Sequence, residues 1–319
     1  MKLAFVVDPL ERLKPYKDSS VAMMREGARR GHEIHVLQAE AMFVREGAVR
    51  ANTRRIDVGD DAHEWYKPQA ERESDLAGDF DVVLMRKDPP FDQEYYYATL
   101  LLDRVAAQGT RVVNSPRALR DWNEKASILA FPQFTPPTLV TSEMPRVHDF
   151  IDAHGDAIVK KLDGMGGTMI FRVQRGDVNR NVIVEAITDL GRRTIMAQKF
   201  IPEIAQGDKR VLVIDGKVFS HCLARIPKAG ETRGNLAAGG RGVAQPISAR
   251  DREIGETVGR DLVKAGIVFA GLDVIGDGLT EINVTSPTGI VEIAQQTGLN
   301  AAKDLLDVLE RAPRATRGG

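Results

Sequence analysis

The stretch "GLDVIGDGLTEIN", residues 271–283, consists of two apolar, strand-like segments joined by a tight turn. If the turn "GDG" is centred on Asp277, antiparallel pairing places Asp273 opposite Glu281, because each lies four residues from the centre. Asn283 lies two residues beyond Glu281, so its side chain points to the same face. The sequence therefore predicts a β-hairpin that gathers three oxygen-bearing side chains on one face.

Two carboxylates that face each other across a sheet need a positive charge between them. Directly opposed like charges destabilise a sheet by about 0.2 to 1 kcal/mol. A divalent cation would remove this conflict, and Asp273, Glu281 and Asn283 offer only oxygen ligands, as Mg²⁺ prefers. We therefore predict a metal site on this hairpin. The alternative is a solvated strand face that carries two acids and an amide.

The segment "KRVLVIDGKVFSHCLARI", residues 209–226, predicts a second hairpin. Its Asp215-Gly216 pair between two apolar runs is a strong signal for a tight two-residue turn. A helix is expected over residues 249–265, between the two hairpins. Cys222 lies within an apolar strand, where a buried structural thiol is commoner than a reactive one.

Arginines recur near the ends of the predicted strands. Arg86 follows "DVVLM", and Arg210 and Arg225 stand on the 209–226 hairpin with no obvious acidic partner on their own strands. Arginine binds carboxylate or phosphate through two parallel hydrogen bonds, although surface ion pairs are its commoner role. The arginines therefore favour a substrate that carries carboxylates.

The segment "KKLDGMGGTMIF", residues 160–171, places a lysine at a strand end, before a glycine-rich turn. It is not a Walker A loop, because the lysine precedes the glycines. Glycines let backbone N–H groups approach an oxyanion closely, and Lys160 supplies a point charge, so the segment suits a phosphate. A plain glycine-rich hairpin loop is the alternative.

The segment "KAGETRGNLAAGGRG", residues 228–242, has five glycines and two arginines but no apolar periodicity. A long, flexible, cationic loop inside a compact protein indicates a functional loop that is ordered only by a ligand. Surface disorder is the alternative.

The first third of the chain alternates short apolar runs with helical patterns over about 19–30 and 93–108. This order predicts a parallel α/β sheet. No G-x-G-x-x-G follows the first strand, so the phosphate site must lie elsewhere. A capped helix is expected to begin in "NSPRALRDWNEK", residues 114–125, and to carry Lys125.

Length and composition exclude several classes of protein. The 319 residues suffice for two or three core units, and a net charge of −1 gives no field that would attract nucleic acid or an anionic membrane. One cysteine permits no internal disulfide and no cysteine-rich metal site. With no signal-like or spanning segment, a cytoplasmic protein is expected.

Several of these segments together resemble the bacterial glutathione synthetases of the ATP-grasp superfamily. They are "LMRKDPPFD", "KLDGMGG", "GDKRVLVIDG", "LARIP", "ETRGNLAAGGRG", "GLDVIGD" and "LTEINVTSPTG". The resemblance covers nearly the whole chain and implies a pre-ATP-grasp parallel-sheet domain followed by the two α+β subdomains of an ATP-grasp fold. The implied boundaries are residues 1–122, 123–200 and 201–319. The resemblance also implies that residues 227–242 form a lid that closes over a reactive intermediate, with Arg233 or Arg241 supplying charge.

The resemblance implies ATP-driven joining of γ-glutamylcysteine and glycine through an acyl phosphate, giving glutathione, ADP and phosphate. It also implies a role for each site residue. The residues expected to bind ATP are Lys125, Lys160, Gly164, Gly166, Gly167, Gln198, Lys199, Phe200, Ile201, Asp208 and Arg210. The residues expected to seat the dipeptide and glycine are Arg86, Arg210, Arg225, Asn283, Ser286 and Thr288, and those expected to assist the chemistry are Arg210, Arg225 and Arg233.

Asp273, Glu281 and Asn283 are implied to hold Mg²⁺, or Mn²⁺ in its place. One departure is Lys161, where the family often has proline; it bears on the stiffness of the glycine-rich cover. The resemblance further implies a homo-oligomer, commonly a tetramer. Two alternatives stay open: another ATP-grasp carboxylate–amine ligase with a different acceptor, and an ATP-binding regulatory module without catalysis.

Overall fold

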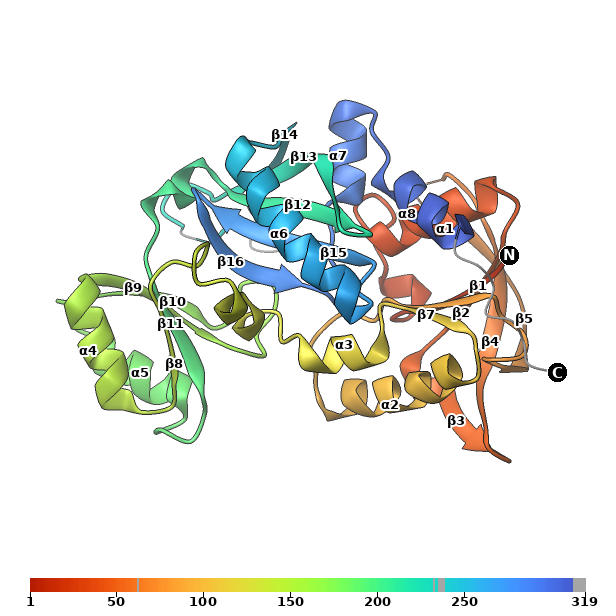
Figure 1. Cartoon of the computed structure of the whole chain (residues 1–319), viewed down its shortest axis with the longest axis horizontal. Helices are drawn as coiled ribbons and strands as arrows, with labels where there is room; N and C mark the ends of the chain where they lie inside the picture. Colours follow the sequence, from red (N-terminus) through yellow and green to blue (C-terminus); the bar gives the residue numbers. More distant parts are fainter. Residues whose placement is uncertain (62, 232, 235–238, 312–319) are drawn as a thin grey trace.

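The structure is a computed structural model that describes residues 1–311 except 62, 232 and 235–238. Three β-sheets with flanking helices make up this part of the chain (Figure 1). Short 3₁₀ turns interrupt the connections: η1 Leu10–Arg12, η2 Ala39–Ala41, η3 Ala126–Ala130 and η4 Pro202–Gln206. None of the described helices is long and apolar enough to cross a membrane.

The first sheet confirms the predicted parallel α/β arrangement. Its inner strands run in the order β2-β1-β6-β7, and each neighbouring pair is parallel. Asp18 caps the first helix, its side chain accepting from the backbone N–H groups of Ser20 and Val21. The elements are β1 Lys2–Val6, α1 Ser19–Arg29, β2 Glu33–Leu37, β6 Val82–Met85, α2 Gln93–Ala107 and β7 Arg111–Val113.

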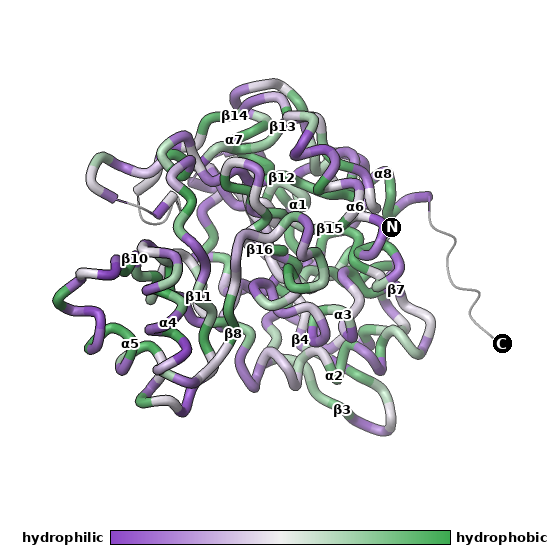
Figure 2. The backbone as a smooth tube through the Cα atoms, turned by 60° about the vertical axis from the view of Figure 1, so that its left-hand side comes forward, coloured by the Kyte–Doolittle hydropathy of each residue, from purple (hydrophilic) through white to green (hydrophobic). Residues whose placement is uncertain are grey.

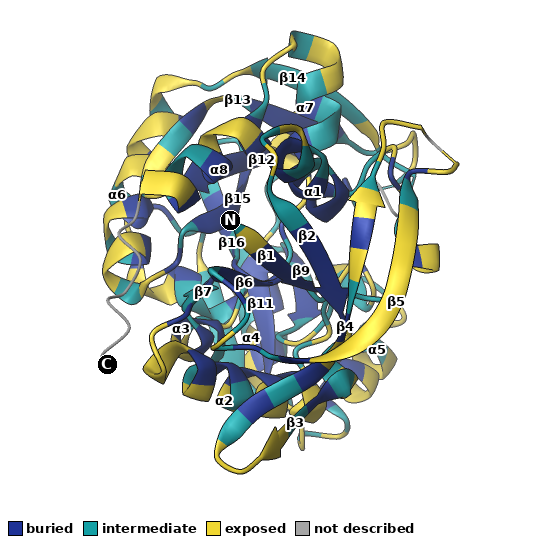
Figure 3. Cartoon of the chain, turned by 90° about the vertical axis from the view of Figure 1, so that its right-hand side faces the viewer, coloured by how far each residue is buried: buried dark blue, intermediate teal, exposed yellow. Residues whose placement is uncertain are grey.

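Three antiparallel strands extend this sheet beyond β2, and the sequence did not predict them. They are β3 Met42–Arg45, β4 Ala48–Val58 and β5 Tyr66–Asp75. Figure 3 shows β5 exposed along most of its length at the edge of the sheet. Backbone pairing with β4 holds this strand in place, and few of its side chains are buried. Its sequence "YKPQAERESD" therefore lacks the apolar alternation from which a strand is predicted.

The second sheet is antiparallel, in the order β10-β9-β11-β8. With its two helices it forms a lobe beside the rest of the molecule (Figure 2). Val147 and Ile151 of one helix and Val184 and Ile187 of the other pack in one apolar cluster with the strands. The elements are β8 Thr138–Thr141, α4 Met144–His154, β9 Asp156–Lys161, β10 Ile170–Gln174, α5 Arg180–Thr188 and β11 Ile195–Lys199.

The third sheet is antiparallel, in the order β14-β13-β12-β15-β16. The predicted hairpin at Asp215 and Gly216 is confirmed: both residues have positive φ, 49° and 74°, and Ile214 pairs with Lys217. The predicted helix at 249–265 is confirmed as α6. The elements are β12 Asp208–Ile214, β13 Lys217–Ile226, β14 Arg241–Pro246, α6 Ala249–Ala265, β15 Phe269–Ile275 and β16 Gly278–Asn283.

The chain after the third sheet returns to the first. Helix α7 Ile290–Thr297 leads to α8 Ala301–Arg311, which packs on α1. Arg30, just after α1, forms ion pairs with Asp307 and Glu310 of α8 at 2.8 and 2.9 Å. The C-terminal helices therefore connect the first and third sheets.

The helix predicted to carry Lys125 ends before that residue. Helix α3 covers Pro116–Asp121 only, and Lys125 lies at the start of the separate turn η3. The Asn123 side chain accepts from the backbone N–H groups of Lys125 and Ala126 at 3.1 and 2.9 Å. This local bond competes with helix continuation, so the chain bends before the lysine.

Candidate functional site

A cavity of about 590 Å³ lies among the three sheets. Its walls include the strand ends of the second and third sheets, the glycine-rich turn after β9, the loop before α1 and the segment 285–288. All the residues predicted to form the site line this cavity, with the exception of Arg86. Segments far apart in the sequence therefore meet at one place.

Two buried lysines converge on one carboxylate. Lys160, at the end of β9, has its Nζ 3.5 Å from Glu281 Oε1 and donates to the Thr280 carbonyl at 3.2 Å. Lys125 Nζ lies 3.6 Å from the same Glu281 oxygen and donates to the Gly164 carbonyl at 2.5 Å. Burial lowers the pKa of Lys160. Two cations around one anion leave a positive surplus, which suits a phosphate chain.

The glycine-rich turn lies over these lysines. Gly166 and Gly167 have φ of 60° and 82°, a conformation that side chains rarely permit. Arg233, from the segment between β13 and β14, reaches this turn: its Nη1 donates to the Gly167 carbonyl oxygen at 3.4 Å. Its other nitrogen, Nη2, donates to Glu231 at 2.6 Å. The predicted lid at 227–242 includes residues 232 and 235–238, which lie outside the described residues.

The hairpin β15–β16 places Asp273 opposite Glu281, as predicted, but the turn and the strand register between them differ from the prediction. Ile275 pairs with Gly278, so the turn is centred between Gly276 and Asp277 and not on Asp277 as predicted. The register then shifts by one residue between Val274 and Asp273. Thr280 is the additional residue, and its hydroxyl donates to the Asp273 carbonyl oxygen at 3.1 Å. A β-bulge therefore brings the two acids into register.

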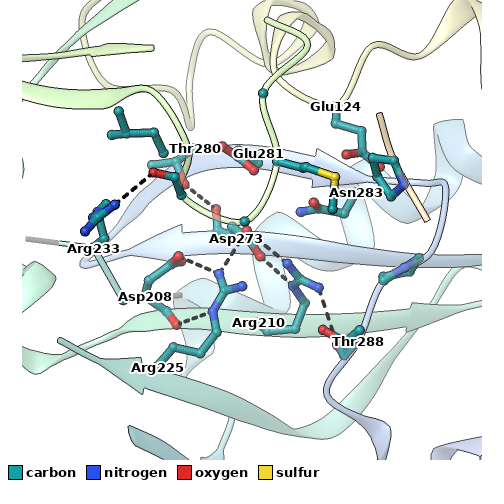
Figure 4. Close-up of a pocket in the computed structure, with 18 of the residues that line it drawn as sticks. Glu124, Asp208, Arg210, Arg225, Arg233, Asp273, Thr280, Glu281, Asn283 and Thr288 are labelled. Atoms are coloured by element: carbon teal, nitrogen blue, oxygen red, sulfur yellow. Dashed lines mark hydrogen bonds and ion pairs between the residues drawn. The ribbon is translucent and has the colours of Figure 1, made fainter. Parts of the chain in front are cut away.

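Asp273 is enclosed by two arginines (Figure 4). Arg210 Nε donates to its Oδ1 at 2.6 Å, and Arg225 Nη2 lies 2.9 Å from its Oδ2. Burial by itself would raise the pKa of Asp273, but the two guanidinium groups hold it below its usual range. Arg225 also donates to Asp208 at 2.5 Å. As the sequence indicated, neither arginine pairs with an acid on its own strand: their acidic partners lie on other strands of the sheet, Asp208 on β12 and Asp273 on β15.

The donor set for a metal is present but partly engaged. Among the described residues, no group of three histidine, cysteine, aspartate or glutamate side chains is arranged to hold an ion. The predicted set instead has two acids and Asn283, whose Nδ2 donates to the Gly271 carbonyl at 3.1 Å and leaves its Oδ1 as the ligand atom. These oxygens fit Mg²⁺ in kind. A cation beside Asp273 would compete with these arginines for its oxygens.

The end of β11 supplies the wall predicted for adenine. Gln198 is buried and its Nε2 donates to the Thr138 hydroxyl at 3.0 Å, while Lys199 to Ile201 line the cavity after it. The Arg172 guanidinium lies 3.8 Å from the centre of the Phe200 ring and fixes that ring. Burial raises the pKa of Asp208, at the start of β12, to about 7.

Arg86 lies behind the cavity and not on it. It is buried, and it donates to the Ser20 hydroxyl and the Pro287 carbonyl, both at 3.1 Å. Its guanidinium carbon lies 5.5 Å from the centre of the Phe269 ring. Arg86 thus supports the segment that carries Ser286 and Thr288, which themselves line the cavity.

Glu124 is a residue that the sequence analysis did not single out. Its Oε1 accepts from the Thr285 hydroxyl at 2.7 Å and from the Thr285 and Val284 N–H groups at 3.1 Å. Burial raises the pKa of this carboxyl group. Glu124 therefore fixes the segment after β16 to the chain next to Lys125. Only its place beside Lys125 could have drawn attention to it, since burial of a glutamate is not visible in the sequence.

Solved structures share the fold of the whole chain. D-cycloserine synthetase DcsG aligns with a TM-score of 0.68 at 16% identity, covering 98% of this chain and 99% of that one. The ATP-grasp ligase PsnB, solved with the precursor peptide PsnA2 and AMPPNP, aligns with a TM-score of 0.61 at 20% identity, covering 97% and 96%. The chain therefore has the ATP-grasp fold, as predicted.

Family comparisons identify the branch of this superfamily. Residues 1–120 match the model of the prokaryotic glutathione synthetase N-terminal domain, and residues 124–298 match that of its ATP-grasp domain. The chain is 55% identical over 314 residues to the glutathione synthetase of Nitrosomonas europaea, covering 98% of both chains. It is 48% identical over 316 residues to that of Vibrio cholerae, covering 99% of both. The chain belongs to the prokaryotic glutathione synthetase family, and it is an ATP-dependent carboxylate–amine ligase that makes glutathione.

Proposed function

We propose that the chain joins γ-glutamylcysteine to glycine at the cavity described above, through an acyl phosphate. The observation that carries the proposal is the convergence of Lys125 and Lys160 on Glu281, directly across the hairpin from Asp273. This places phosphate-binding cations, metal ligands and carboxylate-binding arginines in one cavity. An acyl phosphate route needs these three features and no nucleophilic side chain.

In the first step a cysteinyl carboxylate oxygen attacks the γ-phosphorus of ATP. The bond to the β–γ bridging oxygen breaks, and ADP leaves with that oxygen. In the second step the glycine nitrogen attacks the acyl carbon, phosphate departs, and the nitrogen loses a proton as the amide forms. Neither step leaves a covalent bond to the protein, so positioning and electrostatics supply the acceleration.

The residues divide between nucleotide and peptide. Lys125 and Lys160 hold the phosphates under the turn at 164–167, and the strand end at 198–201 holds adenine, with Asp208 near the ribose. Mg²⁺, or Mn²⁺ in its place, held by Asp273, Glu281 and Asn283, would neutralise charge on the phosphates. These assignments are supported by the lining of the cavity and by the contacts given above.

Arg210 and Arg225 seat the carboxylates of the dipeptide and glycine, together with Ser286 and Thr288. Both arginines bind Asp273 in this structure, so metal binding to Asp273 would release guanidinium groups towards the substrate. We also propose that the protein acts in the cytoplasm and as a homo-oligomer, commonly a tetramer in the family.

The reaction is tested by the release of phosphate from ATP with purified protein. We expect release that requires both γ-glutamylcysteine and glycine, with glutathione formed in equal amount, and much slower release when alanine replaces glycine. Release with γ-glutamylcysteine that does not depend on an amine, or a preference for another acceptor, would contradict the proposal and favour a different ATP-grasp ligase.

A further inference from the structure

One wall of the cavity has no part in the roles assigned above. The loop before α1 contributes Lys17 and Asp18, and the first turn of α7 contributes Glu292. Loop and helix are in contact, because Gln295 Nε2 donates to the Tyr16 carbonyl at 3.4 Å. These residues face the same cavity as the arginines that we assign to the dipeptide.

Glu292 has an unsatisfied oxygen. Its Oε2 is shielded from solvent and has no hydrogen-bond partner among the described residues. A buried carboxylate oxygen without a donor is costly, so such an atom at a cavity wall indicates that a ligand supplies the donor. Burial also raises the pKa of Glu292, as expected for a carboxylate without a close counter-ion.

The neighbouring acids already have partners. Asp8 accepts from Lys87 at 3.4 Å and from the Asp88 N–H at 2.9 Å, and Asp18 caps α1 at 2.7 Å. Asp208 also has an unpartnered oxygen, but Arg225 neutralises its other one. Glu292 is therefore the acid of this wall that is best suited to an incoming cation.

Lys17 supplies the complementary charge. It is half-buried and lines the cavity, yet its ammonium makes no hydrogen bond or ion pair with another described residue. Among the charged residues near Glu292, Lys17 has the largest influence on the pKa of this carboxyl group, which it lowers. A cation and an anion thus lie within electrostatic reach of each other without touching. An α-amino acid group, which carries an ammonium and a carboxylate on one carbon, is complementary to both.

We propose that Glu292 and Lys17 bind the α-amino acid group at the glutamyl end of the dipeptide. Glu292 accepts hydrogen bonds from the α-ammonium, and Lys17 donates to the α-carboxylate. This inference rests on the proposed function. The glutamyl end fits better than glycine, because its ammonium stays protonated throughout, whereas the glycine amine must lose its proton to react. The wall would then distinguish a γ-glutamyl group from other acyl groups on cysteine.

The test compares γ-glutamylcysteine with two analogues that each lack one charge. N-glutarylcysteine lacks the α-amino group, and 4-aminobutanoylcysteine lacks the α-carboxylate. For the wild-type protein we expect kcat/KM to fall about 10- to 100-fold with either analogue, as for loss of a charged hydrogen bond. Glu292→Gln should abolish discrimination against N-glutarylcysteine only, and Lys17→Met should abolish discrimination against 4-aminobutanoylcysteine only. The KM for ATP should not change.

Gln295→Ala serves as the control for packing between α7 and the loop, since its side chain meets Tyr16 and does not line the cavity. It should keep wild-type discrimination. The inference is overturned if Glu292→Gln still discriminates against N-glutarylcysteine, or if this variant raises the KM for glycine instead. Should a variant fail to fold, the wild-type protein still decides: if it uses both analogues as efficiently as γ-glutamylcysteine, the inference alone is refuted. A wild-type protein that does not use γ-glutamylcysteine at all would refute the proposed function.

Discussion

Individual residues at the cavity hold their positions through charged or polar partners on other segments. Arg210 and Arg225 clamp Asp273 from two neighbouring strands, and Glu124 holds the backbone after β16. The sequence displayed all of these residue types but none of the pairings, because each partner lies far along the chain. Pairings of this kind follow from strand register, as with Arg210 opposite Asp273.

We predict that Glu124 stabilises the protein through its Oε1 as a hydrogen-bond acceptor and not through its charge. Glu124→Ala would leave the hydroxyl and N–H of Thr285 and the N–H of Val284 without their partner, at about 1 to 3 kcal/mol for each buried group. We expect a lower unfolding free energy and a higher KM for γ-glutamylcysteine. Glu124→Gln keeps an oxygen at the same place and should lose much less. Equal losses in the two variants, measured by denaturant unfolding, would show that the charge and not the acceptor matters.

At the scale of elements, periodic patterns were predicted well and irregular ones were not. The parallel strands, α1, α2, α6 and the Asp215-Gly216 hairpin were visible in apolar spacing and turn residues. The exposed strand β5 and the early end of α3 were not, because backbone pairing and a side-chain cap decide them. The bulge at Thr280 was also missed, although the facing of the two acids was predicted. The domain boundaries at 122 and 200 stay predictions.

The hairpin turn at Gly216 gives a prediction with a matched control. Gly216 has φ of 74°, and a Cβ there would lie 2.8 Å from Val263 Cγ2 of α6. Gly31 has φ of 77°, but a Cβ there would meet nothing within 4 Å. Gly31→Ala should therefore cost about 1 kcal/mol from backbone conformation alone. Gly216→Ala should cost about 1 to 3 kcal/mol more, from overpacking. Similar losses of unfolding free energy in both variants would contradict close packing of the turn on α6.

At the scale of the whole molecule, the fold places Arg233, from the segment between β13 and β14, at the cavity. Arg233 lines the cavity, 3.4 Å from the Gly167 carbonyl oxygen, whereas Arg241 begins β14 and does not line it. The sequence left both arginines open as the lid cation, since both lie in one glycine-rich stretch. The topology separates them, because β14 pairs with β13 from Arg241 onward. We therefore propose Arg233, and not Arg241, as the arginine that covers the acyl phosphate.

Replacing Arg233 should uncouple ATP cleavage from peptide formation. Its side chain is 38% exposed, so Arg233→Ala should leave the unfolding free energy within about 0.5 kcal/mol of wild type. An acyl phosphate without its cover meets water, which competes with glycine for the acyl carbon. We therefore expect less than one glutathione for each ADP, with the deficit largest at low glycine, because water then competes best. Arg241→Ala, an exposed arginine of the same stretch, should keep a ratio of one. Equal ratios in the two variants at every glycine concentration would mean that the acyl phosphate is protected by other groups of the cavity.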